Sequence, residues 1–552
     1  MKFIRKLLLT LPLLALLAIM LLFMVGQTRW AAGCLSSWIS DNNEYRFSVG
    51  KISYSWQQPD QIRLEDVQLT RSNQALVAKR IDLGLSLRQI TEPRYFHHVT
   101  LHDGTLNIQP QATALPLQAD VLQLSNMALH SSDEHWQLNA QKVNAGITPW
   151  QPKANHLFGE NNQFQFSAGS VTLNGIPASQ VLIQGELKHN QLLLNNVGAD
   201  LAQGNLTGAA SRAANGSWQV ERLRLSGVRM QTPLTLEQLM QRFSTLPTFT
   251  LKHVDLIDAR LEGKEWAFNN VDLSLQNISF GQGDWRSQDG SLNFNASDMI
   301  NGDFHLIDPI MTLRLSSAGI AIQQFITRWE GGLLRTSGHW LRATKRLQLD
   351  EVTMAALEYT LPINWRELWL QPLPAWLAEV YVNKLTTNRN LIIDINPHFP
   401  FQITALDGYG GHLLLACDHQ WGIWGGALNL NGSEATFNKV DVRHPSLALN
   451  ADTGQINVTE LSAFMVPQGL LEAEATVDQR PGKPFQLSLN GRSVPMNILQ
   501  QWGWQPVPLT GDGNLQLRMK GLLNSEQPFK SSLQGTLMVT ASDGQTVNQP
   551  LP

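Results

Sequence analysis

The chain contains 552 residues, of which 16% are charged and 43% are hydrophobic, and its formal net charge is −4 at pH 7. This length is too great for one ordinary compact domain and requires several domains or one long array. The weak acidic balance provides no basic stripe, so nucleic acid is not an expected partner. The two cysteines, Cys34 and Cys417, are too far apart in sequence for a disulfide framework or a metal knuckle, and we expect two inert thiols.

The N-terminus carries an apolar run that is typical of a membrane anchor. Residues 7–25 contain no charged side chain and follow Lys2, Arg5 and Lys6. The run approaches the ~20 residues with which a helix crosses the hydrocarbon layer. Because cationic flanks remain in the cytoplasm, we predict a cytoplasmic N-terminus over residues 1–6 and a single transmembrane anchor over residues 7–26, with all later residues on the far side.

Two kinds of processing are alternatives to an uncleaved anchor. A signal peptide would have an apolar core of only ~7–15 residues and a small-residue cleavage site directly after it. Here Gln27 to Trp30 separate the apolar run from the next small residues. A lipoprotein site before Cys34 is the second alternative, but it lacks the usual leucine and lies beyond Arg29. We therefore favour the uncleaved anchor.

Residues 30–39 predict a short amphipathic helix. Ala31, Leu35, Trp38 and Ile39 recur at the spacing of three and four residues that marks one helical face. This helix could lie on the membrane surface or cover the start of the β region, and the sequence leaves both arrangements open.

Strict alternation of apolar and polar residues dominates the chain beyond residue 45. The clearest runs are residues 81–88, 271–275, 311–315, 486–490 and 515–520. A period of two places the apolar side chains on one face of a strand and the polar ones on the other. Asp-Gly and Asn-Gly pairs predict turns at 103–104, 174–175, 215–216, 431–432 and 543–544. These features indicate many antiparallel hairpins, each exposed to water on one side.

Helical signals are too few for a β/α fold, which needs a helix after nearly every strand. We predict short helices over residues 236–245, 320–329, 375–384 and 496–502. The stretches that begin at Leu313 and Leu487 share an order of strand, short apolar helix, glycine turn and strand. Such a repeat favours an array that grows by the stacking of neighbours.

Two groups of strand motifs bracket the chain. The first comprises residues 52–56, Ile-Arg-Leu-Glu-Asp-Val-Gln-Leu at 62–69, the strand 78–87 and Val-Thr-Leu-His-Asp-Gly-Thr-Leu at 99–106. The second comprises Leu-Thr-Gly-Asp-Gly-Asn-Leu at 509–515, Ser-Leu-Gln-Gly-Thr-Leu at 532–537 and Asp-Gly at 543–544. Together they resemble the AsmA family of Gram-negative envelope proteins, and most of all its shorter members. We therefore distinguish an AsmA-like N-terminal region over residues 27–140, a middle β-repeat region over 141–440 and an AsmA-like C-terminal region over 441–552.

The resemblance implies an elongated, curved antiparallel repeat sheet with a hydrophobic β-groove, anchored in the bacterial inner membrane with its bulk in the periplasm. It implies that the groove handles or transports phospholipid for outer-membrane homeostasis. The alternative is a scaffold or modulator of outer-membrane protein targeting, which would have outer-membrane assembly components as partners. The residues that we expect to line the groove are Leu313, Leu315, Leu487, Leu489, Leu515 and Leu517. For each of them, packing against another sheet is the alternative.

Signals for enzyme chemistry are weak. The G-x-S-x-G, H-E-x-x-H, P-loop and dinucleotide motifs do not occur, so we expect no catalytic residue, no cofactor and no enzyme. His97, His98 and His102 are the strongest metal candidates, but exposed polar residues are ordinary beside an Asp-Gly turn, and we expect no metal site. Trp421 and Trp424 could bind a sugar or an interface, although strand aromatics more often belong to a core.

Overall fold

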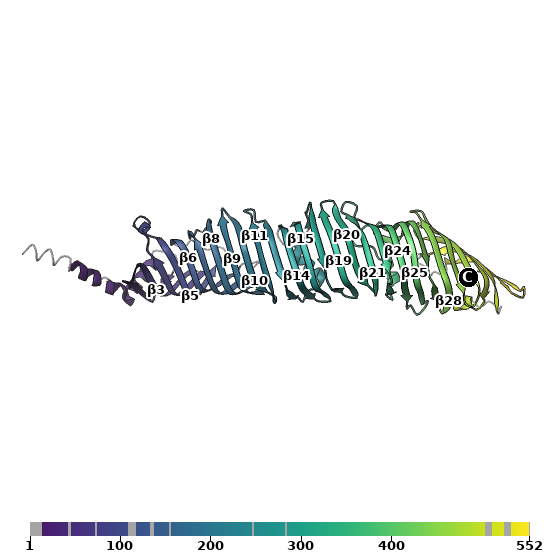
Figure 1. Ribbon diagram of the computed structural model, residues 1–552, viewed down its shortest axis with the longest axis horizontal. Helices are drawn as coiled ribbons and strands as arrows, with labels where there is room; N and C mark the ends of the chain where they lie inside the picture. Colours follow the sequence, from purple (N-terminus) through teal and green to yellow (C-terminus); the bar gives the residue numbers. More distant parts are fainter. Residues whose placement is uncertain are drawn as a thin grey trace, which may run out of the picture. The chain divides into compact units, whose positions relative to one another are not determined.

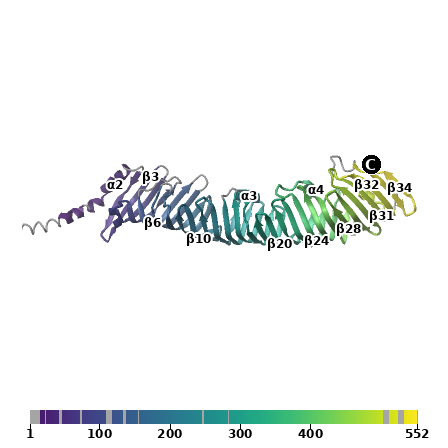
Figure 2. The ribbon, with the colours of Figure 1, turned by 90° about the horizontal axis from the view of Figure 1, so that it is seen from above.

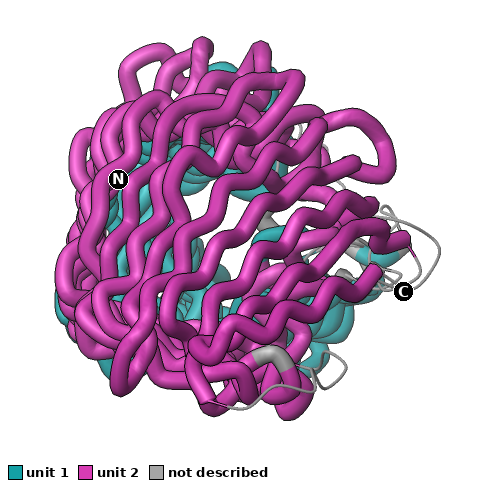
Figure 3. The backbone as a smooth tube through the Cα atoms, turned by 90° about the vertical axis from the view of Figure 1, so that its right-hand side faces the viewer, with its two compact units in different colours: residues 1–231, 240–261, 279–284 teal, residues 232–239, 262–278, 285–552 magenta. Residues whose placement is uncertain are grey.

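The computed structural model describes residues 14–21, 23–41, 46–71, 74–108, 117–132, 137–153, 156–244, 248–281, 284–502, 511–523 and 532–550. The chain divides into two compact units (Figure 3). Unit 1 comprises residues 1–231, 240–261 and 279–284, and unit 2 comprises residues 232–239, 262–278 and 285–552. Both units consist mainly of β-strands (Figure 1). A few short helices connect some of the strands, and α2, α3 and α4 are labelled in Figure 2. The prediction of a mainly-β fold with an antiparallel sheet is confirmed.

In unit 1, the apolar helix that ends at Gly26 is followed by helix α2 and then by a sheet. Its elements are α2 (Arg29–Asp41), β1 (Arg46–Ser48), β2 (Lys51–Ser55), β3 (Gln58–Arg71), β4 (Gln74–Gly84), the 3-10 helix η1 (Leu87–Ile90), β5 (Tyr95–Ile108), β6 (Gln118–Ser132), β7 (Gln137–Thr148), β8 (Asn162–Leu173), β9 (Ile176–Lys188), β10 (Gln191–Leu201), β11 (Gly204–Arg212), β12 (Trp218–Ser226) and β13 (Arg229–Gln231). Four elements have residues in both units, namely α3 (Leu236–Ser244), β14 (Phe249–Gly263), β15 (Trp266–Gly281) and β16 (Asp284–Trp285).

Unit 2 continues in the same style, and its strands run side by side around a curved wall in Figure 3. Its elements are β17 (Gly290–Asn295), β18 (Asp298–Asn301), β19 (Phe304–Ser316), β20 (Gly319–Trp329), β21 (Gly332–Leu341), β22 (Arg346–Ala355), β23 (Glu358–Thr360), α4 (Trp365–Leu370), β24 (Glu379–Asp394), β25 (Phe401–Cys417), β26 (Gln420–Asn431), β27 (Glu434–Phe437), β28 (Val440–Ala451), β29 (Gln455–Met465), β30 (Leu470–Asp478), β31 (Pro484–Pro495), α5 (Ile498–Gln501), β32 (Asp512–Leu522), β33 (Gln534–Ala541) and β34 (Thr546–Pro550).

Among the described strands, pairing is antiparallel in most places and changes to parallel at three crossovers. β3, β4 and β5 pair antiparallel, as do the strands from β6 to β12. The parallel pairs are β5 with β6, β12 with β14, and β22 and β23 with β24. Because a parallel neighbour must start at the edge opposite to the one where the previous strand ended, the intervening chain has to cross the sheet. In unit 2 this crossing segment contains α4, which lies on one side of the sheet around β24 (Figure 2).

The predicted turns differ in outcome. Turns separate the paired strands at Asn174–Gly175, Asn215–Gly216 and Asp543–Gly544, as predicted. The turn predicted at Asn431–Gly432 is wrong, because β26 and β27 on either side of it both pair with β25 and with β28, so the chain keeps its direction. The turn predicted at Asp103–Gly104 is wrong, because β5 runs through it. Asp103 instead adopts a φ of 50° within the strand, and the register of β5 with β4 and β6 is the same on both sides of it.

The predicted helices also differ in outcome. α2 and α3 confirm the helices expected over 30–39 and 236–245, and α5 confirms a shorter part of 496–502. At α3, the Thr235 hydroxyl accepts a hydrogen bond of 3.3 Å from the Gln238 amide, which is half of a capping box. The helix predicted over 320–329 is wrong, because these residues form β20 between β19 and β21. The helix predicted over 375–384 is also wrong, since β24 begins at Glu379.

The apolar N-terminal segment is described from Leu14 onward, so the first part of the predicted anchor over 7–26 lies outside the described residues. Among the described helices, none is by itself both long and apolar enough to cross a bilayer. Leu14–Gly26 and Arg29–Ser37 reach that length and composition together, across a bend of 73°.

Candidate apolar binding sites

One face of the first strands of unit 1 is uniformly apolar. In the strand register, Ile62 lies opposite Leu83, which lies opposite Val99, and Val99 in turn pairs with Leu122 of β6. The alternating sequence therefore places one row of apolar side chains on the same face of four adjacent strands. The next row, two residues away, is Leu64, Ile81, Leu101 and Leu124.

This face encloses a cavity of about 380 Å³, which we call cavity 1. Its lining is apolar throughout and consists of Leu35, Phe47, Ile52, Ile62, Leu64, Val67, Leu69, Leu76, Ile81, Leu83, Phe96, Val99, Leu101, Leu106, Leu117, Leu122, Trp150, Leu157 and Phe158. The volume falls within the ~300–1,000 Å³ of pockets that hold small ligands. With no polar group to orient a ligand, cavity 1 suits a hydrocarbon chain and offers nothing for chemical catalysis.

The cover of cavity 1 comes from segments outside the paired strands. Leu35 reaches it from α2, while Trp150 and Phe158 reach it from the chain that follows β7. The Trp150 indole is 3% exposed and donates a hydrogen bond of 3.1 Å to the Leu157 carbonyl, so its buried polar atom is satisfied. α2 is held to the sheet because the Ser36 hydroxyl accepts a hydrogen bond of 3.0 Å from the Val49 amide.

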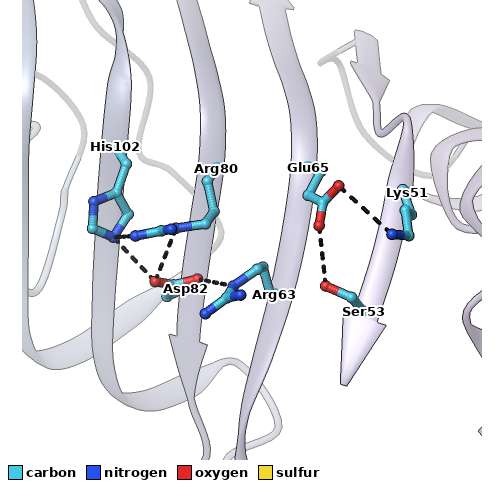
Figure 4. A network of polar contacts seen from close by, with 7 residues as sticks. All are labelled: Lys51, Ser53, Arg63, Glu65, Arg80, Asp82 and His102. Carbon is cyan, nitrogen blue, oxygen red and sulfur yellow. Dashed lines mark hydrogen bonds and ion pairs between the residues drawn. The ribbon is translucent and has the colours of Figure 1, made fainter. Parts of the chain in front are cut away.

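The opposite face of the same strands carries charge (Figure 4). The Asp82 side chain is 8% exposed and meets the Arg63 Nε atom at 3.1 Å, the Arg80 Nε atom at 3.3 Å and the His102 Nε2 atom at 3.0 Å. Lys51 and Glu65 pair beside them at 3.9 Å. These contacts tie β3, β4 and β5 together from the polar side. The strands are therefore strongly amphipathic, with charged side chains on one face and apolar side chains on the other.

A second polar cluster joins the first residues of β5 and β6. The Tyr95 hydroxyl donates a hydrogen bond of 2.5 Å to Asp120 Oδ1, and the His97 Nδ1 atom lies 3.1 Å from Asp120 Oδ2. The hydroxyl donor, followed by His97 and Arg88, lowers the pKa of the Asp120 carboxyl. Burial, followed by the hydrogen bond to Asp120, raises the pKa of Tyr95. This cluster stabilises the parallel junction and contains no group poised as a nucleophile.

Unit 2 contains its own apolar pocket of about 410 Å³, which we call cavity 2. Its lining residues are Phe399, Phe437, Val442, Pro445, Leu461, Ser462, Ala463, Leu471, Ala473, Leu489 and Trp502. Leu461, Ala473 and Leu489 are direct neighbours across β29, β30 and β31, so the pocket rests on the apolar face of these strands. Trp502 closes one side, and its indole donates a hydrogen bond of 3.1 Å to the Phe437 carbonyl.

The six leucines predicted to line a groove fall into two groups. Leu313, Leu315, Leu487 and Leu489 are half-buried, and Leu489 belongs to cavity 2. Leu515 and Leu517 are only 2% and 5% exposed, because they pack in a core cluster with Met496, Ile498 and Val539. Three lining residues were not predicted from the sequence, namely Trp150, Phe158 and Phe399. They lie outside the strands, so no alternation marks them.

The candidates for other chemistry are dispersed. His102 pairs with Asp82 and His97 with Asp120, and among the described residues no cluster of three or more His, Cys, Asp or Glu is arranged to hold a metal ion. Trp421 stacks on Trp369 with ring centroids 5.8 Å apart. The Trp424 indole donates to the Gln420 carbonyl at 3.2 Å.

The two cysteines occupy different environments. Both are free thiols; Cys34 is exposed on α2, and Cys417 is half-buried at the end of β25. Burial, with smaller contributions from Asp418 and Glu379, raises the pKa of the Cys417 thiol and so disfavours its reactive thiolate.

The family model described as "AsmA family" matches residues 46–548 of the chain. The AsmA family protein YicH of Escherichia coli (strain K12) is 48% identical to it over 553 residues, which cover 100% of this chain and 97% of that relative. No solved structure matches the chain. The family match includes nearly all residues that line the two cavities, Leu35 of α2 excepted.

Proposed function

Because the chain belongs to the AsmA family, as its strand motifs indicated, we propose that it is an inner-membrane protein with a periplasmic body that binds and passes on phospholipid acyl chains, and that it is not an enzyme. The family is associated with the bacterial envelope. The cationic residues before the apolar segment favour a cytoplasmic N-terminus.

The observation that carries the proposal is the purely apolar lining of cavity 1. All of its lining side chains are hydrocarbon, aromatic or indole, while charges gather on the opposite face of the same strands. An acyl chain that leaves water for such a lining gains ~0.8 kcal/mol for each buried methylene. A polar or charged ligand would lose its hydration without gaining a partner. Cavity 1 therefore selects hydrocarbon.

Cavity 2 provides a second apolar site, in unit 2. It is similar in volume to cavity 1 and also rests on the apolar face of consecutive strands. Transfer along a protein requires several weak, similar positions, because one tight site would retain the lipid. Half-buried Leu313, Leu315 and Leu487 supply further apolar positions on strand faces, and we propose that they contact the transferred chain.

The alternative role as a scaffold for outer-membrane proteins would require strand edges that accept a client chain. Interior strands offer no such edge. β30, for example, pairs with β29 through residues 470–478 and with β31 through residues 470–477. The described pairings therefore favour binding on the apolar face over binding at an edge.

The test uses two neighbouring residues of β4 that face opposite sides. Leu76 lines cavity 1, whereas Val77 is 44% exposed and lies outside that lining. We expect a photoreactive amino acid at position 76 of the full chain, irradiated in living cells, to form phospholipid adducts that mass spectrometry detects. The same group at position 77 serves as the matched control and should form few or none.

Three results would contradict the proposal. If folded, membrane-inserted protein forms no lipid adducts at position 76, cavity 1 does not bind phospholipid. Equal adducts at positions 76 and 77 indicate non-selective contact with membrane. Capture of an unfolded outer-membrane protein at position 76, instead of lipid, supports the scaffold.

A further inference from the structure

The edge of unit 1 nearest the apolar N-terminal helix presents unusually exposed apolar side chains. Leu87 and Ile90 are 88% and 83% exposed, the two highest values among the large apolar residues of the described chain. Trp56, in the turn between β2 and β3, is 62% exposed, and Trp30 of α2 is 70% exposed. Single exposed apolar residues are ordinary on protein surfaces, but a group at one edge requires a partner.

The two loops that carry Trp56, Leu87 and Ile90 leave the sheet at the same edge. β3 begins two residues after Trp56, and its residue Gln61 lies opposite Gly84, the last residue of β4. The Leu85 amide then donates a hydrogen bond of 2.6 Å to the Asp60 carbonyl, so the chain towards η1 starts beside the start of β3. The two loops that carry Trp56, Leu87 and Ile90 therefore project from one edge of the sheet.

The loop that presents Leu87 and Ile90 is ordered by its own hydrogen bonds. The Ser86 hydroxyl accepts from the Arg88 amide at 3.2 Å, and the Ser86 amide donates to the Gln89 side-chain oxygen at 3.1 Å. This capping box fixes the one-turn helix η1 with both apolar side chains directed into solvent.

The apolar N-terminal helix touches the same edge. The ring centroid of Phe23 lies 4.9 Å from the ring centroid of Trp56 and 5.5 Å from that of Tyr54. The Gln27 side-chain amide donates a hydrogen bond of 3.3 Å to the Tyr54 carbonyl. The helix from Leu14 to Gly26 therefore leads directly to the β2–β3 turn. If this helix enters a bilayer, the turn lies at the bilayer surface.

From this continuity we propose that the edge of unit 1 makes a second membrane contact, in which Trp30, Trp56, Leu87 and Ile90 insert into the interface beside the anchor. The proposal rests on the membrane anchor of the proposed function. Tryptophan is the side chain favoured at the boundary between headgroups and acyl chains. The exposed Arg94 flanks the insertion and can extend its cation to a lipid phosphate, whereas Arg88 lies over the Tyr95 ring and pairs with Asp120.

This contact places cavity 1 close to the source of its ligand. Leu35, which lines cavity 1, lies five residues after Trp30 on the same helix α2. α2 also turns by 73° away from the apolar helix, so it would run close to the plane of a bilayer that the apolar helix crosses. A lipid tail could then pass from the membrane surface to cavity 1 without crossing a long path through water.

The test measures insertion directly in the full chain. Cys34 and Cys417 are replaced by serine, a single cysteine is placed at position 87 or 90, and an environment-sensitive fluorophore is attached. The protein is reconstituted, one copy per nanodisc, in phosphatidylethanolamine and phosphatidylglycerol that carry a quencher near the headgroup. Because interfacial residues lie ~5–10 Å below the headgroups, we expect about twofold or greater loss of emission at both positions.

Two further labels serve as controls. Ile176 is the first residue of β9, directly after the β8–β9 turn; it is 60% exposed at the other edge of the unit 1 sheet, and a label there should not be quenched. A label at Leu17, within the apolar helix, should be quenched by lipids that carry the quencher deeper along the acyl chain.

The outcomes separate the inference from the proposed function. Quenching at 17 without quenching at 87 and 90 overturns the second contact and leaves the anchor intact. No quenching at 17 contradicts the anchor itself. A blue-shifted label at 87 that lipid does not quench indicates a protein partner, and equal quenching at 87 and 176 indicates non-specific adsorption. Each of the last two results also overturns the inference.

Discussion

The Arg366 Nη2 atom lies 3.0 Å from Oδ2 of Asp394, and the Asp394 side chain is fully buried. The same Oδ2 atom accepts a hydrogen bond of 3.2 Å from the Trp365 indole, while Oδ1 accepts one of 3.0 Å from the Asn396 amide. Asp394 is the last residue of β24, and Trp365 and Arg366 open α4. One carboxylate therefore fixes the helix of the crossover to the strand that follows it.

We expect Asp394→Ala to lower the free energy of unfolding by about 1–3 kcal/mol, because it removes the buried acceptor that Trp365, Arg366 and Asn396 share. Thermal unfolding of the full chain in detergent, followed by circular dichroism, measures the change. The matched control is Glu351→Ala, which removes the exposed 3.1 Å pair with Lys384 and should cost ~0–1 kcal/mol. Equal losses in the two variants would contradict the anchoring role of Asp394.

The backbones of β4 and β5 approach each other closely at Gly104. A Cβ atom on Gly104 would lie 1.9 Å from the Val77 carbonyl oxygen, so Gly104→Ala must displace β4 or β5. We expect a loss of about 2 kcal/mol or more, since overpacking moves the backbone. Gly146, in β7, has nothing within 4 Å of the same position, and Gly146→Ala should leave the unfolding temperature unchanged or slightly raised.

The hydrogen bond from Tyr95 to Asp120 should make stability depend on pH in the acid range. Because the folded chain lowers the pKa of Asp120, this carboxylate stabilises the fold above its unfolded pKa and loses that effect as the pH falls through the folded pKa. Tyr95→Phe removes the largest cause of the shift. The difference in unfolding temperature between the native chain and the variant should therefore be greatest near neutral pH and should shrink on acidification.

Tyr359→Phe is the control for this pH dependence. Burial is the main cause that raises the pKa of Tyr359, and no carboxylate depends on its hydroxyl for a lowered pKa. Its effect on the unfolding temperature should stay constant across the acid range. A Tyr95→Phe effect that is equally constant would show that the hydroxyl does not stabilise the Asp120 carboxylate.

Core leucines and lining leucines should respond differently to truncation. Leu515 is 2% exposed in the cluster that contains Met496 and Ile498, so Leu515→Ala should cost ~2–5 kcal/mol. Leu489 is half-buried on cavity 2, and Leu489→Ala should cost less stability while reducing the phospholipid that copurifies with the full chain. Mass spectrometry of bound lipid, normalised to folded protein, checks this. Unchanged lipid with Leu489→Ala would contradict a lipid site in cavity 2.

The apolar and polar faces of the strands could be predicted because the alternation of residue types is a local feature of the sequence. Leu487, Ser488 and Leu489 alternate, and the structure pairs all three with β30 and β32 in unbroken register. The helix prediction that began at Ile320 was wrong for an equally local reason. A bulge shifts the register between Ile322 and Phe325, so the apolar spacing there changes from two residues to three and imitates a helix.

The residues that line the two cavities were less predictable than the strand faces, because a cavity also depends on the segments that cover the strands. Leu515 and Leu489 alternate in the same way along neighbouring strands, yet the segment with Met496 and Ile498 buries the first, while the second lines a cavity. Trp150 and Trp502 cover apolar strands from loops and a short helix end, where no periodic pattern exists. Only the three-dimensional course of these segments distinguishes core from lining.

The parallel crossovers limit how proteins of this architecture can change length during evolution. In an antiparallel run, loss of one strand would reverse the direction of every strand that follows, and their connections would emerge from the wrong border. Loss or gain of a hairpin preserves direction, as does duplication of a whole block from one crossover to the next. The strands that follow the three described crossovers, β6, β14 and β24, begin at residues 118, 249 and 379, about 130 residues apart, which is the size expected of such a block. Longer and shorter homologues should therefore differ by strand pairs or by blocks of this size.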